Sequence, residues 1–158
     1  MPIPSYPKIL IVENELIIAA DVLVQFSKLG CQMLGIHARA IDALKTIVAN
    51  RPDLVIINVG LPGKLNGLAA ARLMTQDYHL PLIFLSSHTD EDSLQGALAL
   101  RPWAFIAKPF INEDLENALA YILTRLAQPL RELDYQNTCK LFFNGEVYRL
   151  KLPPPLED

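Results

Sequence analysis

The chain has 158 residues, a formal net charge of −3 and a pI of about 5.6. This length predicts one domain with its own core, and the acidic balance excludes a general attraction for nucleic acid or anionic lipid. The two distant cysteines, Cys31 and Cys139, indicate free thiols in a reducing compartment. Because neither a signal peptide nor a run of about 18 apolar residues occurs, we expect a cytoplasmic protein without membrane association.

Strand and helix patterns alternate along the chain. Short apolar runs predict strands at residues 8–12, 31–37, 54–58, 81–86 and 103–107. Apolar residues at helical spacing predict helices at 14–29, 39–49 and 67–74, a short helix opening at Thr89 or Asp90, and a last helix starting at Asn112. Gly30 and Pro52 mark helix ends, and Asn66 is suited to cap the helix that follows it.

This order of elements predicts the fold class. Five strands that are each followed by a helix, and that are mostly apolar on both faces, indicate a parallel sheet covered on both sides. Right-handed crossovers then give an α/β, flavodoxin-like, doubly wound (βα)5 fold.

The C-terminal residues follow a different pattern. The helical period fails after Pro129, which predicts a linker at 128–138, and two apolar runs then flank Asn144-Gly145, a signal for a β-hairpin. A hairpin alone is marginally stable in water, so it must pack on the domain, pair with another copy or belong to something larger. We therefore divide the chain into an N-terminal tail (1–7), a main domain (8–127), the linker and a hairpin extension (139–158).

Polar side chains follow the predicted strands at the points where those strands end. Because the carboxyl ends of parallel strands converge on one crevice, these residues form the candidate site. They are Glu13 and Asn14, Asn58, Ser86 and Ser87, and Lys108.

With these residues in register, the chain resembles the receiver domain of two-component response regulators. The resemblance runs from residue 8 to about 127. Its motifs are Ile9-Leu-Ile-Val-Glu13-Asn14-Glu15, Pro52-Asp-Leu-Val-Ile-Ile-Asn58, Pro81-Leu-Ile-Phe-Leu-Ser86 and Phe105-Ile-Ala-Lys108-Pro109-Phe110. In that family an acidic pair helps to hold Mg²⁺, and an aspartate ending the third strand takes a phosphoryl group from a histidine kinase. The bond between the lysine and the proline is often cis.

The resemblance also implies roles for single residues. Ser86 matches the hydroxyl switch, Phe105 the rotating aromatic and Lys108 the lysine that contacts phosphate. Glu13 matches the first metal-binding acid, and Gly60 matches the position that lends Mg²⁺ a backbone carbonyl.

Two positions depart from the family pattern. Asn14 replaces the second acid, and Asn58 replaces the phosphoacceptor. A carboxamide is neutral and is a poor nucleophile where a carboxylate attacks. Mg²⁺ favours carboxylate oxygens, and the charge of Glu13 is balanced by that of Lys108. We therefore expect no cofactor, with Mg²⁺ binding weak or absent.

The leading hypothesis is a non-enzymatic signalling module that cannot be phosphorylated at residue 58 and acts through protein–protein interaction. Its expected partners are a histidine kinase or a downstream protein, or a second copy bound through residues 90–126 or the 139–152 hairpin. No recognition helix or basic stripe follows the hairpin, so we expect no binding to nucleic acid. Two alternatives stay open: a working phosphotransfer switch that uses Ser86, Ser87 or a nearby acid, and a small-molecule binder in the same crevice. The second is weakened because no glycine-rich phosphate loop follows the first strand.

Overall fold

The computed structural model describes residues 7–87 and 91–154. Its strands are β1 (Lys8–Val12), β2 (Gln32–His37), β3 (Leu54–Asn58), β4 (Leu82–Ser86), β5 (Ala104–Ala107), β6 (Thr138–Phe143) and β7 (Glu146–Lys151). Its helices are α1 (Leu16–Lys28), α2 (Ala40–Ala49), α3 (Gly67–Gln76), α4 (Glu91–Leu98), α5 (Asn112–Leu126), the 3-10 helix η1 (Pro129–Arg131) and α6 (Glu132–Tyr135). The expected start of the fourth helix at Thr89 or Asp90 lies outside the described residues.

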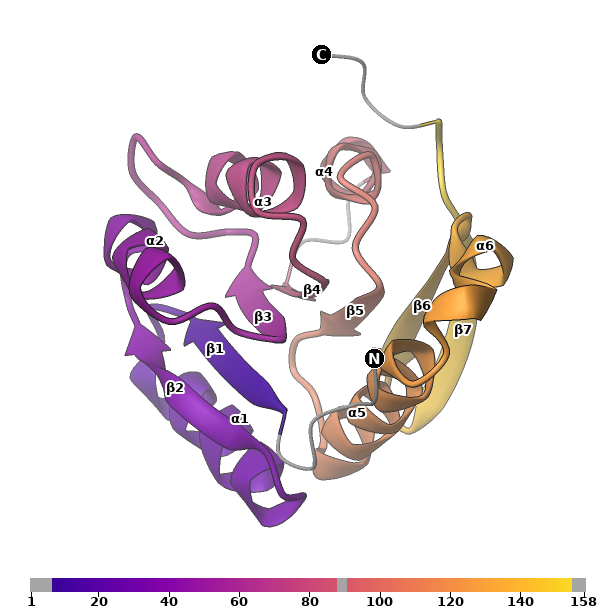
Figure 1. Ribbon diagram of the computed structural model, residues 1–158, viewed down its shortest axis with the longest axis horizontal. Coiled ribbons are helices and arrows are strands. Elements are labelled where there is room, and N and C mark those ends of the chain that lie inside the picture. The colour runs from indigo at the N-terminus through magenta and orange to yellow at the C-terminus, as the bar shows by residue number, and fades with distance from the viewer. Residues whose placement is uncertain (1–6, 88–90, 155–158) are drawn as a thin grey trace.

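One sheet runs through the molecule in the order β2-β1-β3-β4-β5-β6-β7. Helices α2, α3 and α4 cover one face, and α1 and α5 cover the other (Figure 1). Neighbouring strands from β2 to β6 are parallel, and β7 runs antiparallel to β6. The predicted flavodoxin-like, doubly wound fold is confirmed, and the structure shows that its five parallel strands lie in the order 2-1-3-4-5.

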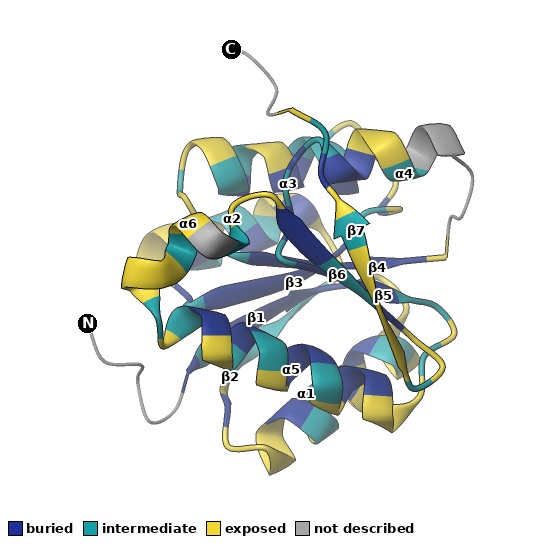
Figure 2. Cartoon of the chain, turned by 90° about the vertical axis from the view of Figure 1, so that its right-hand side faces the viewer, coloured by how far each residue is buried: buried dark blue, intermediate teal, exposed yellow. Residues whose placement is uncertain are grey.

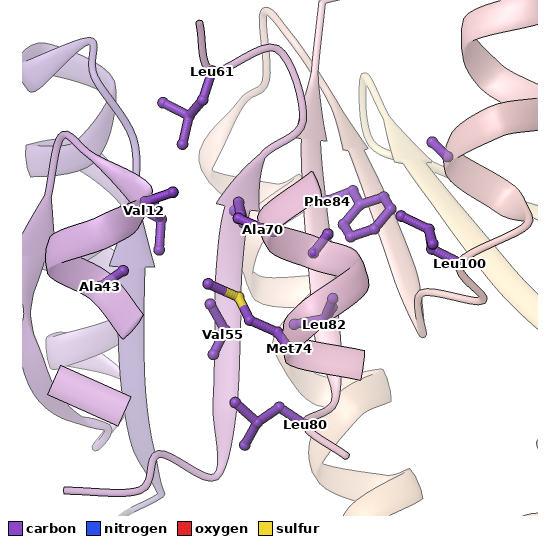
Figure 3. Packing of buried hydrophobic residues seen from close by; sticks show 14 of the residues in the cluster. Val12, Ala43, Val55, Leu61, Ala70, Met74, Leu80, Leu82, Phe84 and Leu100 are labelled. Carbon is purple, nitrogen blue, oxygen red and sulfur yellow. The ribbon is translucent and has the colours of Figure 1, made fainter. Parts of the chain in front are cut away.

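Two apolar layers hold the sheet between its helices. Val55, Met74 and Phe84 belong to the layer under α2, α3 and α4, where side chains of the sheet interlock with those of the helices (Figure 3). Phe26 and Ile56 belong to the layer under α1 and α5. Every residue of β3 and β4 is buried (Figure 2), which explains why these strands are apolar on both faces.

The C-terminal hairpin continues the central sheet. Strand β6 pairs in parallel with β5, and β7 pairs with β6. The turn residues Asn144 and Gly145 have φ values of 52° and 82°, which suit the two-residue turn that the Asn-Gly sequence predicts. Of the three arrangements left open by the sequence, the structure shows the hairpin packed on its own domain. By pairing with β5, the hairpin covers one edge of residues 90–126, the surface that we expected to bind partners.

The segment expected to be an irregular linker contains helical turns. Helices η1 and α6 fill residues 129–135. Each is too short to repeat a 3.6-residue period, so the sequence pattern gave no helical signal there. Arg125 on α5 forms an ion pair with Glu132 on α6 and ties this segment to the domain.

Three charged side chains hold the two ends of the hairpin by hydrogen bonds to its backbone. Asp114, fully buried at the start of α5, accepts hydrogen bonds from the backbone N–H of Asn144 (3.1 Å) and of Gly145 (2.8 Å). At the other end, Arg101 donates to the carbonyl of Pro153 at 2.7 Å. Arg125, 4 % exposed, donates to the carbonyl of Thr138 at 3.3 Å. The hairpin is therefore an integral part of the described structure.

Within the described ranges, none of the helices combines the length and the apolar character that crossing a membrane requires.

Candidate functional site

The carboxyl ends of β1, β3 and β5 bring Glu13, Asn58 and Lys108 together. Strand β1 lies directly beside β3, so Glu13 and Asn58 follow neighbouring strands although they are 45 residues apart in sequence. Lys108 follows β5, and its backbone N–H donates to the carbonyl of Ser86 at 2.9 Å. The predicted convergence of these three side chains is what the structure shows.

The side-chain amide of Asn58 uses both its donor and its acceptor groups. Its Nδ2 donates to Glu13 Oε2 at 2.8 Å and to Asn14 Oδ1 at 3.1 Å. Its Oδ1 accepts the backbone N–H of Gly60 at 2.8 Å. Because a backbone N–H can only donate, the Gly60 contact fixes which end of the amide is oxygen. An aspartate in this place could not make the two donated bonds.

Glu13 is the charged centre of the site and its side chain is fully buried. Its Oε2 also accepts the backbone N–H of Asn14 at 2.9 Å, and its Oε1 forms an ion pair with Lys108. The side chain of Lys108 is only 8 % exposed. A buried charge requires a partner of opposite sign and hydrogen bonds; Lys108 supplies the first at Oε1, and N–H groups of Asn14 and Asn58 supply the second at Oε2.

These contacts bear on the divalent cation that the resemblance implies. Mg²⁺ requires oxygen ligands, but N–H groups of Asn58 already point at the oxygens of Glu13 and Asn14. Gly60 contributes an N–H to this network. In the described part of the chain, no group of three or more His, Cys, Asp or Glu side chains is placed to hold a metal ion. The donor set at this crevice does not match the preference of Mg²⁺.

The two residues matched to the conformational switch lie on β4 and β5 and are both buried. Ser86 is 5 % exposed and Phe105 is 3 % exposed. The ring of Phe105 meets that of Phe84 edge to face, with centroids 5.5 Å apart. A cavity of about 210 Å³ lies beside them, lined by Val59, Gly60, Leu68, Ser86, Leu94, Ala97 and Phe105.

A close approach of helix α3 supports the loop after Asn58. A Cβ atom on Gly67 would lie 2.3 Å from the carbonyl oxygen of Asn58 and 2.7 Å from the Cα of Val59. Only glycine therefore allows α3 to begin at this point. Asn66 caps the helix as predicted, because its Oδ1 accepts the N–H of Ala69 at 2.9 Å.

Sequence reasoning found the residues of the site but missed some of their contacts. The Gly60 carbonyl role implied by the resemblance stays a prediction, and the sequence gave no reason to expect that the Gly60 N–H donates to Asn58. It also gave no reason to expect the buried Asp114 beside the hairpin turn. The available signal was an acid at the third position of a helix, where its side chain can cap the first turn. In the structure, Asp114 Oδ2 accepts the N–H of Ile111 at 3.0 Å. The bond between Lys108 and Pro109 is cis, as the resemblance implies.

Comparisons with known proteins identify the family of the chain. The sequence model of the response regulator receiver domain matches residues 9–120. The transcriptional regulatory protein PdtaR of Mycobacterium tuberculosis is 26% identical over 121 residues, which cover 77% of this chain and 58% of PdtaR. Sporulation initiation phosphotransferase F of Bacillus subtilis is 28% identical over 112 residues, which cover 71% of this chain and 90% of that protein.

Solved structures give the same result. The signal receiver domain of a modulated diguanylate cyclase from Desulfovibrio desulfuricans G20 has a TM-score of 0.69 and 28% identity, covering 82% of this chain and 98% of that domain. The receiver domain of NtrX from Brucella abortus has a TM-score of 0.68 and 28% identity, covering 73% and 98%.

The relatives also differ from this chain in length. The alignment spans 58% of PdtaR and 51% of the sensory transduction protein BceR of Halalkalibacterium halodurans. What these longer proteins do as a whole therefore does not transfer directly. The family itself is established by the match over residues 9–120, by the fold and by the convergent strand-end residues: this chain belongs to the response regulator receiver domain family of two-component signalling.

Proposed function

We propose that this chain is a receiver-like signalling module that takes no phosphoryl group at residue 58, has no catalytic activity of its own, and acts through contacts with other proteins. Its partners are signalling proteins of a two-component system, either a histidine kinase or a downstream protein. The hydrogen bonding of the Asn58 amide carries this proposal.

Phosphoryl transfer at this position needs an anionic oxygen. In a receiver with an aspartate, a carboxylate oxygen forms a bond to phosphorus while the bond from phosphorus to the donor breaks, and the electron pair leaves with the donor. The Asn58 oxygen is neutral and already accepts the Gly60 N–H, and the lone pair of its nitrogen is delocalised. Residue 58 therefore provides no suitable nucleophile for the bond to phosphorus.

The local charge supports weak or absent Mg²⁺ binding. Glu13 and Lys108 form an ion pair whose charges cancel. Two of the three carboxylates that attract a hard dication in this family are replaced by amides, at Asn14 and Asn58. A site without net negative charge holds a divalent cation weakly.

An intact-mass spectrum tests the proposal. The native chain is incubated with Mg²⁺ and acetyl phosphate, beside a variant carrying Asn14→Asp and Asn58→Asp and beside a receiver domain known to react with this donor. We expect an unchanged mass for the native chain and a phosphoryl adduct for the reactive receiver domain. The double variant reports whether the two amides are the whole obstacle.

An adduct on the native chain would overturn the proposal. Peptide mapping would then assign the acceptor, and a phosphoryl group on Ser86, Ser87 or a nearby acid would establish the alternative of a working switch. That outcome would make the chain a phosphotransfer protein of an unusual kind.

A further inference from the structure

Strand β7 is the edge strand of the sheet on the side of the C-terminal extension. Among the strands of residues 7–87 and 91–154, β7 is the final one in the sheet order and pairs with β6 alone. Its residues are mostly exposed, in contrast to the buried strands behind it (Figure 2). Val147 and Tyr148 are each 47% exposed. The hairpin thus presents apolar side chains beside a row of backbone groups.

The register of the hairpin shows which backbone groups face outward. Phe143 and Glu146 flank a two-residue turn, so they exchange backbone hydrogen bonds, and this pattern alternates along the strand pair. The N–H and C=O groups of Val147, Arg149 and Lys151 therefore point away from β6. The N–H of Lys140 donates to the carbonyl of Trp103 at 3.3 Å, which agrees with this alternation.

One face of the hairpin carries three positive charges, of which Lys140 lies 4.6 Å from the centroid of the Tyr121 ring and Arg149 donates to Thr138 Oγ1 at 3.3 Å. Arg149 lies directly opposite Lys140 across the strand pair, and Lys151 lies on the same face. Like charges placed opposite each other destabilise a strand pair. In the part of the chain that the structure describes, neither of the two ion pairs includes any of these three cations. They form the basic face of the hairpin (Lys140, Arg149 and Lys151).

Other strand edges of the sheet are less suited to an added strand. The edge of β5 is paired with β6. Strand β2, at the far end of the sheet, has an irregular register against β1 next to Gly35, whose φ is 142°. Strand β7 pairs with β6 over six residues without a bulge. A regular, exposed strand is a template on which another chain can add by backbone hydrogen bonds.

We propose that an extended segment of a partner protein, with acidic side chains at alternate positions, adds to the sheet along the outer edge of β7. Its backbone pairs with the outward groups of Val147, Arg149 and Lys151, and its acidic side chains meet the basic face of the hairpin. Because successive side chains of a strand alternate between faces, an alternating acidic pattern fits this surface. The inference rests on the proposed interaction role and names the surface and the chemistry of the partner.

Two blocked synthetic peptides test this surface. One alternates glutamate with valine, and the other alternates lysine with valine. With the ¹⁵N-labelled full chain, we expect the acidic peptide to shift the amide signals of Val147, Arg149 and Lys151 saturably. The basic peptide should bind at least about tenfold more weakly. Equal binding of both peptides, no binding of the acidic one at millimolar concentration, or shifts confined to another surface would overturn the proposal.

Variants separate the backbone contribution from the charge contribution. Val147→Pro removes an outward N–H and no charge, and it leaves the backbone hydrogen bonds to β6 in place, so affinity should fall at least about tenfold. Arg149→Gln with Lys151→Gln should weaken binding by a similar factor and keeps the test decisive if the proline variant does not fold. Lys28→Gln with Lys45→Gln removes the same charge from exposed helix positions and should change affinity less than about twofold. Equal losses in the two glutamine pairs would show a net-charge effect and reject the β7 surface.

The outcome is independent of the phosphorylation test. A phosphoryl adduct on the native chain would refute the proposed function while the peptide experiment still decided the β7 surface. An unchanged mass together with no site-specific peptide binding would refute only the present inference.

Discussion

At the scale of single residues, an amide at residue 58 turns a site for negative charge into a closed hydrogen-bond network. Asn58 donates to Glu13 and accepts from Gly60, so one side chain supports a buried carboxylate and the loop behind it. A carboxylate there would face Glu13 with the same charge and without a proton to share. Like charges at this distance raise the energy of the ionised pair.

Substitution of Asn58 tests this balance. We expect Asn58→Asp to lower the free energy of unfolding by about 1–3 kcal/mol in the absence of Mg²⁺, because buried hydrogen bonds are lost. The native chain should show no rise in melting temperature on addition of millimolar Mg²⁺, whereas Asn14→Asp with Asn58→Asp should show one. Thermal unfolding with NaCl at matched ionic strength provides the control. A clear Mg²⁺-dependent rise for the native chain would contradict the proposed lack of tight binding.

The two thiols predict a pH dependence of stability. Burial raises the pKa of Cys31 from 9.0 to about 11 and that of Cys139 from 9.0 to about 12. Above pH 9 the unfolded chain loses thiol protons that the folded chain keeps. The folded state then binds more protons, so the free energy of unfolding falls as pH rises from 9 toward 11. Below pH 9 both states keep the protons and this contribution disappears.

Urea unfolding at pH 8 and pH 10 measures this effect. A variant with Cys31→Ala and Cys139→Ala should lose less stability between the two pH values than the native chain. Tyr121, whose pKa is also raised mainly by burial and to a smaller extent by Cys139, adds a pH dependence of the same sign that largely cancels in the comparison. The same pH dependence in both proteins would show that the thiols are not responsible.

At the scale of elements, the start of α5 connects the candidate site to the hairpin. The loop after β5 carries Lys108, which pairs with Glu13, and leads within a few residues to Asp114. The two oxygens of Asp114 accept three backbone N–H groups, from Ile111, Asn144 and Gly145. One buried carboxylate therefore fixes both the start of the helix and the hairpin turn.

Replacing one carboxylate oxygen of Asp114 by an amide group should weaken its hydrogen bonds to the hairpin turn. In Asp114→Asn the new amide group would face a backbone N–H, so we expect a loss of about 2–3 kcal/mol in the free energy of unfolding. Amide hydrogen exchange at Asn144 and Gly145 should become faster. Glu116→Gln, an exposed position on the same helix, removes the same charge and should leave both quantities nearly unchanged. Equal effects of the two substitutions would indicate a general charge effect in place of the specific contact.

At the scale of the whole molecule, the extension changes which surfaces are open. Strand β6 pairs with β5 along Ala104, Phe105 and Ile106. Phe142 on β6 is 1 % exposed and belongs to the layer under α1 and α5. The hairpin therefore completes the core as well as covering an edge.

Removal of residues 128–158 should expose β5 and open this core. We expect the free energy of unfolding to fall by at least about 3 kcal/mol, the usual cost of deleting one buried aromatic side chain. The shortened chain should also self-associate, because an unpaired central strand becomes an edge. Urea unfolding and light scattering after size exclusion measure the two effects. A shortened chain as stable and as monodisperse as the full chain would contradict this account.

The sequence alone was sufficient for the main elements and for the members of the site. Fully apolar strands and helical periods predicted β1 to β5 and the helices around them, since both patterns are local properties of the chain. The parallel order of the strands then placed Glu13, Asn58 and Lys108 in one crevice. The Asn144-Gly145 turn was predicted for the same local reason.

Tertiary structure decided what depends on distant contacts. The direction of the Asn58 amide follows from Glu13, 45 residues away, and from the N–H of Gly60. The place of the hairpin beside β5, and the role of Asp114 in holding it, follow from contacts about 30 residues apart in sequence. Periodicity records which face of an element is buried, but it carries no information about which element will cover that face. For this reason the sequence identified a receiver with an amide at its centre, and only the folded chain showed which surfaces it leaves open.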